Sequence, residues 1–321
     1  MKLSSTIVNL NDSKSLYNGI VKSILSKRHY IEEGKIDTPI FNDGETSPHF
    51  KSSVRGKRVY ILSSPNTPIK REQLYLTIDA ARRASAIEII PIIPYMPYAR
   101  QDKKDQYRGP IGARVFAEIL EGRGATSIIT FDLHSSQIVG FFKIPVNHLS
   151  GKYLFYDYIL KTCNSNSVLC SPDAGGLKRV KKIRDLILKR HSSVKIPFIS
   201  LDKTRSKANE VGEIEVLGDV KGRNVLIIDD MVDTGGTIIK GADALLKSGA
   251  HSVRVLVTHA VLSGDASDRL RDSNIDEFIC SDSLIDVDAK NDMNGKLTVI
   301  TTCDEIANAI LSINSDDSLY K

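Results

Sequence analysis

The chain contains two similar stretches, VRGKRVYIL at residues 54–62 and VKGRNVLII at residues 220–228, which indicate how it is organised. Each begins with a basic turn around a glycine and continues into a short, mostly β-branched apolar run, which is typical of a buried strand. Each leads through a polar loop into a helical pattern (72–86 and 237–250) and then a second apolar strand (87–95 and 252–261). This order, found twice, predicts an α/β protein of two duplicated domains, each with a mostly parallel sheet flanked by helices.

The chain is long enough for two such domains. It has 321 residues, of which 41% are hydrophobic and 26% charged, and this is the composition of a globular protein. We expect a boundary near residues 148–152, where the sequence HLSGK separates the halves. This gives an N-terminal domain of residues 1–149 and a C-terminal domain of residues 150–321, with a tail that can pack back.

Composition and charge exclude several classes of protein. No apolar run approaches the length of a membrane span, the start lacks a signal-peptide pattern, and the four cysteines have no paired spacing. We therefore expect a cytoplasmic protein that has no membrane partner. The net charge of +5 is spread over short basic groups, and there is no Trp and no zinc-finger spacing. This favours small polyanionic ligands over nucleic acid.

The loop after the second of the similar strands has the sequence DDMVDTGGT. Two carboxylates suit the vicinal hydroxyls of a sugar, whereas glycines, threonines and a helix N-terminus suit a phosphate. The alternative is an acidic turn with a threonine helix cap. The first half has SSPNTP at the equivalent place, which lacks both features, so only one half is expected to bind a sugar phosphate. The candidate residues are Asp229, Asp230, Asp233, Thr234, Gly235, Gly236 and Thr237.

This loop resembles the phosphoribosyl diphosphate loop of type I phosphoribosyltransferases, and further segments narrow the resemblance. They are FNDGE at 41–45, YARQDKKD at 98–105, FDLHSSQIVGFF at 131–142, SPDAGGLKRV at 171–180 and KTRSKANEV at 203–211. Their order and spacing, from about residue 36 to 265, are similar to those of the ribose-phosphate diphosphokinases.

The resemblance implies two phosphoribosyltransferase-like domains, with ATP on the N-terminal side and ribose 5-phosphate on the C-terminal side. It implies transfer of the diphosphate of ATP to the 1-hydroxyl of ribose 5-phosphate, with Mg²⁺ as cofactor. It also implies a homo-oligomer built from dimers, up to a hexamer. The residues implied for ATP are Phe41, Asp43, Glu45, Arg100, Gln101, Lys103, Lys104 and Asp105. Without the resemblance, these segments would be a solvent-exposed turn and a charged loop.

Three residues are implied for the metal. Asp132 and His134 are two residues apart in the apolar segment SIITFDLH, so a strand would place their side chains on one face. Without the resemblance, a single histidine at a strand end would usually be a hydrogen-bonded structural residue. The resemblance adds Asp173 and makes Asp132 the weaker candidate. It also implies that backbone N–H groups of Gly175 and Gly176 hold the diphosphate.

Three basic residues follow this loop, Lys178, Arg179 and Lys182. They are either an outer shell of positive charge near the diphosphate or the solvated face of the next helix. We expect the helix face for Arg179 and Lys182, and the outer positive charge for Lys178.

Lys203 and Arg205 are the expected catalytic residues, in a polar segment with little to anchor it. Cations delivered by such a lid would stabilise the charge that spreads over oxygens during diphosphoryl transfer. The alternative is a solvated loop.

Two other classes of protein remain to be separated from a ribose-phosphate diphosphokinase. They are a non-catalytic regulatory homologue and a phosphoribosyltransferase that consumes the diphosphate product. Lys143 and Asn147 stand where related chains often have Asp, so the sequence leaves open whether a second cation site exists there.

Overall fold

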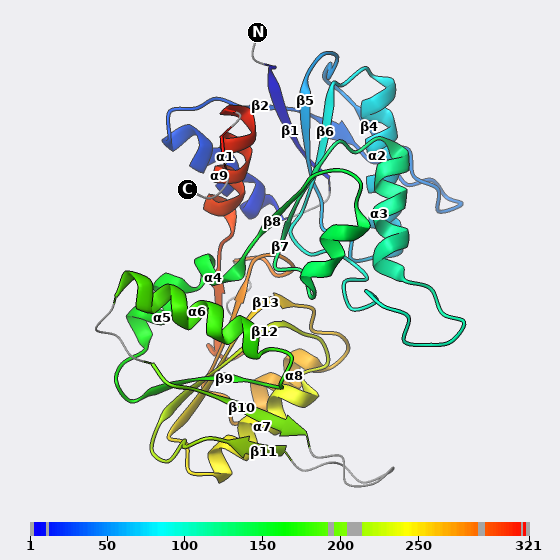
Figure 1. Cartoon of the computed structure of the whole chain (residues 1–321). Helices are drawn as coiled ribbons and strands as arrows, with labels where there is room; N and C mark the ends of the chain where they lie inside the picture. The colour runs from blue at the N-terminus through cyan, green and yellow to red at the C-terminus, as the bar shows by residue number, and fades with distance from the viewer. Residues whose placement is uncertain are drawn as a thin grey trace. The chain divides into compact units, whose positions relative to one another are not determined.

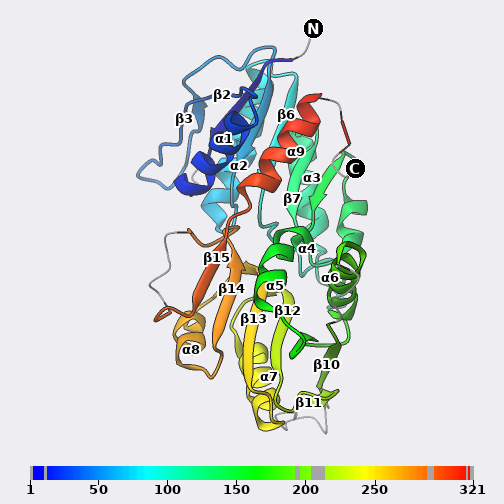
Figure 2. The same ribbon diagram turned by 90° about the vertical axis from the view of Figure 1, so that its left-hand side faces the viewer.

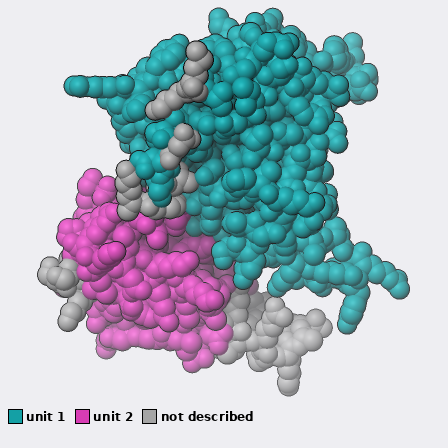
Figure 3. Space-filling view, turned by 45° about the horizontal axis from the view of Figure 1, so that its top comes forward, with its two compact units in different colours: residues 1–149, 301–321 teal, residues 150–300 magenta. Residues whose placement is uncertain are grey.

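The computed structural model describes residues 3–10, 13–191, 196–203, 214–287, 293–315 and 317–318, without the side chain of Lys203. It divides into two compact units, Met1–Leu149 with Thr301–Lys321, and Ser150–Ile300 (Figure 3). None of the helices in the described ranges combines the length and the apolar character needed to cross a membrane.

The first unit has a six-stranded parallel sheet in the order β2-β1-β5-β6-β7-β8 (Figure 1). Helices α2 and α3 cover one face of this sheet, and α1 and α9 contribute to the hydrophobic cluster on the other. A small antiparallel pair, β3 with β4, lies outside the sheet. The elements are β1 (Ser5–Asn9), α1 (Lys14–Ser26), β2 (Glu32–Glu33), β3 (Ile36–Asp37), β4 (His49–Phe50), β5 (Arg58–Leu62), α2 (Pro68–Arg83), β6 (Glu88–Ile93), α3 (Gly112–Arg123), β7 (Ile128–Phe131), the 3₁₀ helix η1 (Ser136–Phe141), β8 (Val146–Leu149) and α9 (Cys303–Ser315).

The second unit has a seven-stranded sheet in the order β11-β10-β9-β12-β13-β14-β15, in which β11 alone is antiparallel to its neighbour. Helices α4, α5 and α6 pack on one face, and α7 and α8 on the other. The elements are α4 (Gly151–Leu154), α5 (Tyr156–Thr162), β9 (Ser167–Ser171), α6 (Leu177–Arg190), β10 (Phe198–Lys203), β11 (Ile214–Leu217), β12 (Asn224–Val232), α7 (Gly236–Lys247), β13 (Ser252–Ala260), α8 (Ala266–Asp272), β14 (Glu277–Ser281) and β15 (Leu297–Ile300).

The two similar stretches of sequence occupy equivalent places. β5 lies between β1 and β6, β12 lies between β9 and β13, and each is followed by a helix that packs on its own sheet. Every residue of β5 is buried, as expected of a parallel strand covered on both faces. The predicted fold class, mostly parallel sheets flanked by helices, is therefore confirmed.

The last helix belongs to the first unit. The sequence-based division assigned residues 150–321 to the second domain with a tail that can pack back, and α9 lies beside α1 in the first unit (Figure 2). Ile306 and Ile310 of α9 are fully buried in the cluster that contains Ile20 and Ile24 of α1. Polar contacts hold the carboxyl end of α9, where the Tyr60 hydroxyl donates to Asn314 Oδ1 at 3.0 Å.

Candidate functional site

The carboxyl edge of the second sheet gathers several of the predicted residues. β10, β9 and β12 are mutually parallel neighbours, so they all end on the same edge. The loops that follow β9 and β12 each lead into a helix, α6 and α7. In open α/β sheets such an edge is where ligands bind.

Asp229 and Asp230 lie near the end of β12, and the side chain of Asp230 is almost fully buried. Nη1 of Arg179, in the first turn of α6, is 3.4 Å from Asp230 Oδ1 and 3.6 Å from Asp229 Oδ1. Burial, and then the neighbouring Asp230 charge, raise the pKa of Asp229 to about 8, while Arg179 opposes this shift. Two adjacent carboxylates thus share one nearby cation.

Sequence reasoning missed Arg179, which was expected on the solvated face of its helix. Its spacing from the glycines of the preceding loop is that of a first helical turn, and only the pairing of β9 with β12 brings that turn over the two carboxylates. Lys178, which was preferred, is exposed.

The loop from Asp233 to Thr237 leads directly into α7. Gly235 precedes the helix with φ 74° and ψ −11°, a left-handed conformation that glycine adopts without strain. The helix starts at Gly236, so its first N–H groups point at this loop. Nη1 of Arg269, in α8, donates to the Thr234 carbonyl oxygen at 3.2 Å, which brings a second positive charge that sequence reasoning missed.

The loop after β9 is held in shape by its own side chains. Asp173 is exposed, and its Oδ1 accepts a hydrogen bond from the Gly176 N–H at 2.8 Å. The Ser171 hydroxyl donates to the Asp173 carbonyl oxygen at 2.6 Å. A Cβ at position 176 would come within 2.6 Å of that hydroxyl oxygen, so a larger residue would displace the Ser171 side chain. Gly175 is exposed beside it.

Lys203 is the last residue of β10, and its backbone pairs with Ile214 of β11. Its main chain therefore reaches the same sheet edge as Asp229 and Asp230. The Lys203 side chain and the whole of Arg205 lie outside the described residues. The predicted catalytic role of both residues stays a prediction.

In the first unit, Phe41, Asp43 and Glu45 form an exposed turn. The Phe41 N–H donates to the Glu45 carbonyl oxygen at 2.8 Å, and Asp43 Oδ1 accepts from the Glu45 N–H at 3.0 Å. Gly44 has φ 90° at the tip. Phe41 as a whole is 51% exposed, which leaves it accessible to a base or to another chain.

The charged segment after β6 lies at the carboxyl edge of the first sheet. Lys103 Nζ is 3.5 Å from Asp105 Oδ1, and the Gln101 carbonyl oxygen accepts from the Ala113 N–H at the start of α3. The residues predicted for ATP in this segment are all exposed: Arg100, Gln101, Lys103, Lys104 and Asp105.

Asp132 and His134 also lie at this edge, but not within a strand as the sequence indicated. β7 ends at Phe131 because Asp132 adopts a positive φ of 34°, which no strand accommodates. A positive φ at a residue other than glycine costs free energy and is often found at functional sites. The next residue, Leu133, donates its N–H to Nε2 of His148 at 3.0 Å.

The metal candidates divide between the units, with Asp132 and His134 in the first and Asp173 in the second. Within the described ranges, no three or more His, Cys, Asp or Glu side chains are grouped as a metal site.

Comparison with known proteins places these observations in a family. Residues 5–124 match the N-terminal domain of ribose phosphate pyrophosphokinase, and residues 189–321 match the phosphoribosyl synthetase-associated domain. The chain is 41% identical to a ribose-phosphate pyrophosphokinase of Porphyromonas gingivalis, over 89% of this chain and 88% of the other. It is 36% identical to that of Corynebacterium ammoniagenes, over 98% and 95%.

A solved structure agrees with the sequence comparisons. The phosphoribosylpyrophosphate synthetase from Mycobacterium smegmatis superposes with a TM-score of 0.86 at 34% identity, covering 98% of this chain and 99% of that one. The family suggested by the motifs is therefore confirmed, and the chain belongs to the ribose-phosphate pyrophosphokinases, which are enzymes.

Proposed function

We propose that this enzyme transfers the diphosphate of ATP to the 1-hydroxyl of ribose 5-phosphate, giving phosphoribosyl diphosphate and AMP. Family membership supports the reaction. The observation that carries it for this chain is the pair Asp229–Asp230 beside the loop at the start of α7. This edge offers carboxylates for a sugar and N–H groups for a phosphate a few residues apart.

Ribose 5-phosphate binds at the loop after β12 in this proposal. The Asp229 and Asp230 carboxylates accept hydrogen bonds from the 2- and 3-hydroxyls. The 5-phosphate lies over Thr234–Thr237, where helix N–H groups and the helix dipole favour an anion. Asp233 borders this cup, and the Arg269 guanidinium beside Thr234 adds attraction for the phosphate.

ATP binds at the first unit, where exposed basic side chains on the loop after β6 can pair with its phosphates. Phe41 offers an exposed ring on which adenine can stack. Its exposed neighbour Ile40 would be covered in a homo-oligomer built from dimers, which we also propose. The enzyme is expected to act in the cytoplasm, where its two substrates are available.

The donors present fit Mg²⁺ as the cofactor. This ion uses one or two carboxylates, substrate phosphates and several waters, so a preassembled cluster of protein ligands is not required. Asp173 presents an exposed carboxylate whose Oδ1 is oriented by Gly176, and His134 and Asp132 are the candidates on the first unit. Bound Mg²⁺ would neutralise charge on the phosphates of ATP.

The remaining residues act on the diphosphate as it moves. N–H groups of Gly175 and Gly176, at the start of α6, hold its oxygens, and Lys203 and Arg205 supply positive charge where negative charge develops. Arg179 keeps the two carboxylates of β12 in place for the sugar hydroxyls.

The test is formation of AMP by the purified protein with ATP, Mg²⁺ and ribose 5-phosphate. Asp230→Ala should raise KM for ribose 5-phosphate by about tenfold or more, because a hydrogen bond to a charged group contributes about 1.5–3 kcal/mol. Asp243→Asn, on the exposed side of α7, is the control and should change little. No turnover would indicate a non-catalytic homologue. Consumption of phosphoribosyl diphosphate with a free base would indicate a transferase; either result would refute the proposal.

A further inference from the structure

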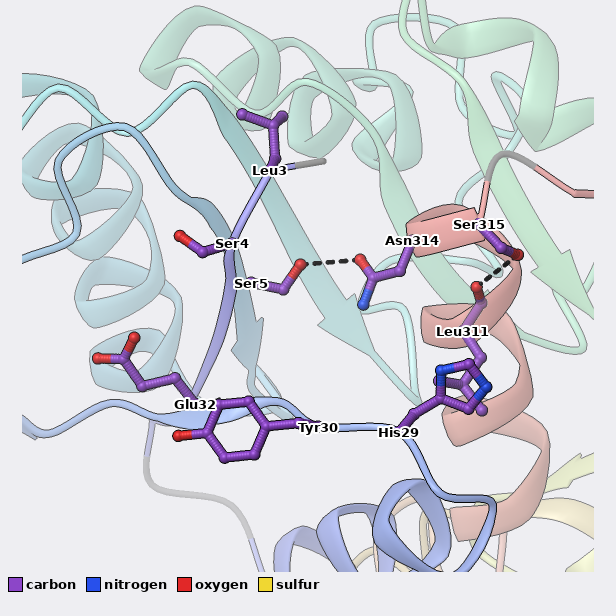
Figure 4. A pocket seen from close by; sticks show the side chains of 9 residues that line it. All are labelled: Leu3, Ser4, Ser5, His29, Tyr30, Glu32, Leu311, Asn314 and Ser315. Atoms are coloured by element: carbon purple, nitrogen blue, oxygen red, sulfur yellow. Dashed lines mark hydrogen bonds between the residues drawn. The ribbon is translucent and has the colours of Figure 1, made fainter. Parts of the chain in front are cut away.

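A cavity of about 240 Å³ lies in the first unit, at the opposite end of the sheet from the ATP candidates. Its walls come from the amino end of β1, the segment between α1 and β2, and the last turn of α9 (Figure 4). The strands of this sheet are parallel, so the amino end of β1 is remote from the carboxyl edge. The volume exceeds what a few waters need and suits a ligand smaller than a typical drug molecule.

One side of the cavity carries a hydrogen-bond donor whose direction is fixed. Asn314 Oδ1 accepts from the Ser5 hydroxyl at 2.8 Å, from Arg58 Nη1 at 2.9 Å and from the Tyr60 hydroxyl at 3.0 Å. Arg58 can only donate, so this atom must be the amide oxygen. The amide nitrogen is then turned toward the side of the cavity where His29 lies (Figure 4), and within the described ranges no group accepts a hydrogen bond from it.

The opposite side carries two aromatic rings. Tyr30 is 79% exposed, and His29 next to it is also exposed. Both project at the rim of the cavity rather than packing into the core (Figure 4). An exposed ring beside a fixed donor suits a flat heterocycle, which stacks on the ring while one edge accepts the hydrogen bond.

The charge in the cavity excludes an anion as the preferred ligand. Glu32 is the charged residue of the lining, and its carboxylate forms an ion pair with Lys57 at 2.6 Å. Among the described lining residues there is neither Lys nor Arg, and the Lys57 ammonium is already engaged by Glu32, so the lining offers a phosphate no basic side chain of its own. A ligand group that donates a hydrogen bond to the Glu32 carboxylate would be favoured.

From this geometry we infer a second small-molecule site, which binds an uncharged nucleobase or nucleoside. The base stacks on Tyr30 and accepts a hydrogen bond from the Asn314 amide nitrogen, and an exocyclic N–H or a ribose hydroxyl donates to Glu32. The site is separate from the substrate sites, and the inference does not depend on the reaction proposed above.

Titration calorimetry with adenosine, guanosine, cytidine and uridine tests the inference on the full chain. At least one nucleoside should bind saturably, and its 5′-monophosphate should bind more weakly. Asn314→Asp keeps the oxygen that accepts from Ser5, Arg58 and Tyr60 but replaces the donor by an acceptor, so it should weaken binding by about tenfold or more. Asn308→Asp makes the same change earlier on α9, where the side chain binds Lys27, and should leave binding within about twofold.

Tyr30→Ser provides a second variant that does not depend on the polar network. Its ring is largely exposed, so the fold should be unaffected, and loss of stacking should also weaken binding by about tenfold. If none of the four nucleosides binds saturably, the inference is overturned. So would binding that both Asn314→Asp and Tyr30→Ser leave unchanged, since the ligand would then occupy another site such as that for ATP.

Discussion

Replacing Arg179 by Met should destabilise the second unit in a manner that depends on pH. The Arg179 guanidinium is the cation that faces both Asp229 and Asp230, at 3.6 and 3.4 Å. Met retains most of the apolar stem, so the change removes mainly the charge. Two carboxylates of low exposure, 23% and 6%, would then repel each other with the Arg179 charge removed.

The magnitude follows from the contacts. Removing one partner of a fully buried ion pair costs about 3–5 kcal/mol. Here Arg179 is 20% exposed and both contacts are long, so we expect a lower cost, about 2 kcal/mol at pH 9. For a unit of this size that corresponds to a fall in Tm of roughly 4–8 °C.

At pH 6 the cost should be smaller. The pKa of Asp229 is raised to about 8, so at pH 6 this carboxyl is already protonated and only Asp230 loses its partner. Thermal melts of Arg179→Met at pH 6 and pH 9 measure the difference, with the exposed neighbour Lys178→Met as control. Equal losses of stability at the two pH values, or a loss no larger than that of the control, would mean that Arg179 does not compensate the two carboxylates.

Three further predictions follow from the site. The pKa of Asp229 is raised in the folded chain from its ordinary value of 3.8 to about 8. The protonated Asp229 therefore contributes its full stabilisation below pH 3.8, and this contribution is lost as the pH rises toward 8. Asp229→Asn should flatten the dependence of Tm on pH between about 4 and 8, and an unchanged slope in thermal melts would contradict this. Asp173→Ala should raise the Mg²⁺ concentration needed for half-maximal rate while leaving the ribose 5-phosphate affinity largely intact, and a wild-type Mg²⁺ titration would remove Asp173 from the metal site. Lys203→Ala should fold normally and lower kcat by about 10²–10³ with a smaller effect on KM, as for the loss of one contact that stabilises developing charge; a near-normal kcat in steady-state kinetics would leave Lys203 without a catalytic role.

The fold could be predicted because its signal is local. Each of the two similar segments carries its own turn, buried strand and helix, and parallel pairing follows from that order. Helix α2 begins at Pro68, earlier than the apolar pattern indicated, because Pro at the first helical position and the Thr67 cap extend it. Strand β7 ends earlier than predicted because a single residue, Asp132, turns to positive φ.

The parts that could not be predicted depend on tertiary contacts. The apolar spacing of α9 predicts an amphipathic helix but not the surface on which it packs, and the structure packs it with α1 in the first unit. Arg179 and Arg269 have the spacing of ordinary exposed helix residues. They become part of the candidate site because the first turn of α6 lies beside the two carboxylates of β12, and Arg269 of α8 lies beside Thr234.

In the proposed reaction the two terminal phosphates of ATP move together, and ATP labelled at the β-phosphate tests this transfer. After reaction with ribose 5-phosphate and Mg²⁺, the label should be found on the sugar product, with unlabelled AMP formed in equal amount. Label that remains in ADP while ribose 5-phosphate is consumed would mean that only the γ-phosphate is transferred, and would contradict the proposed function.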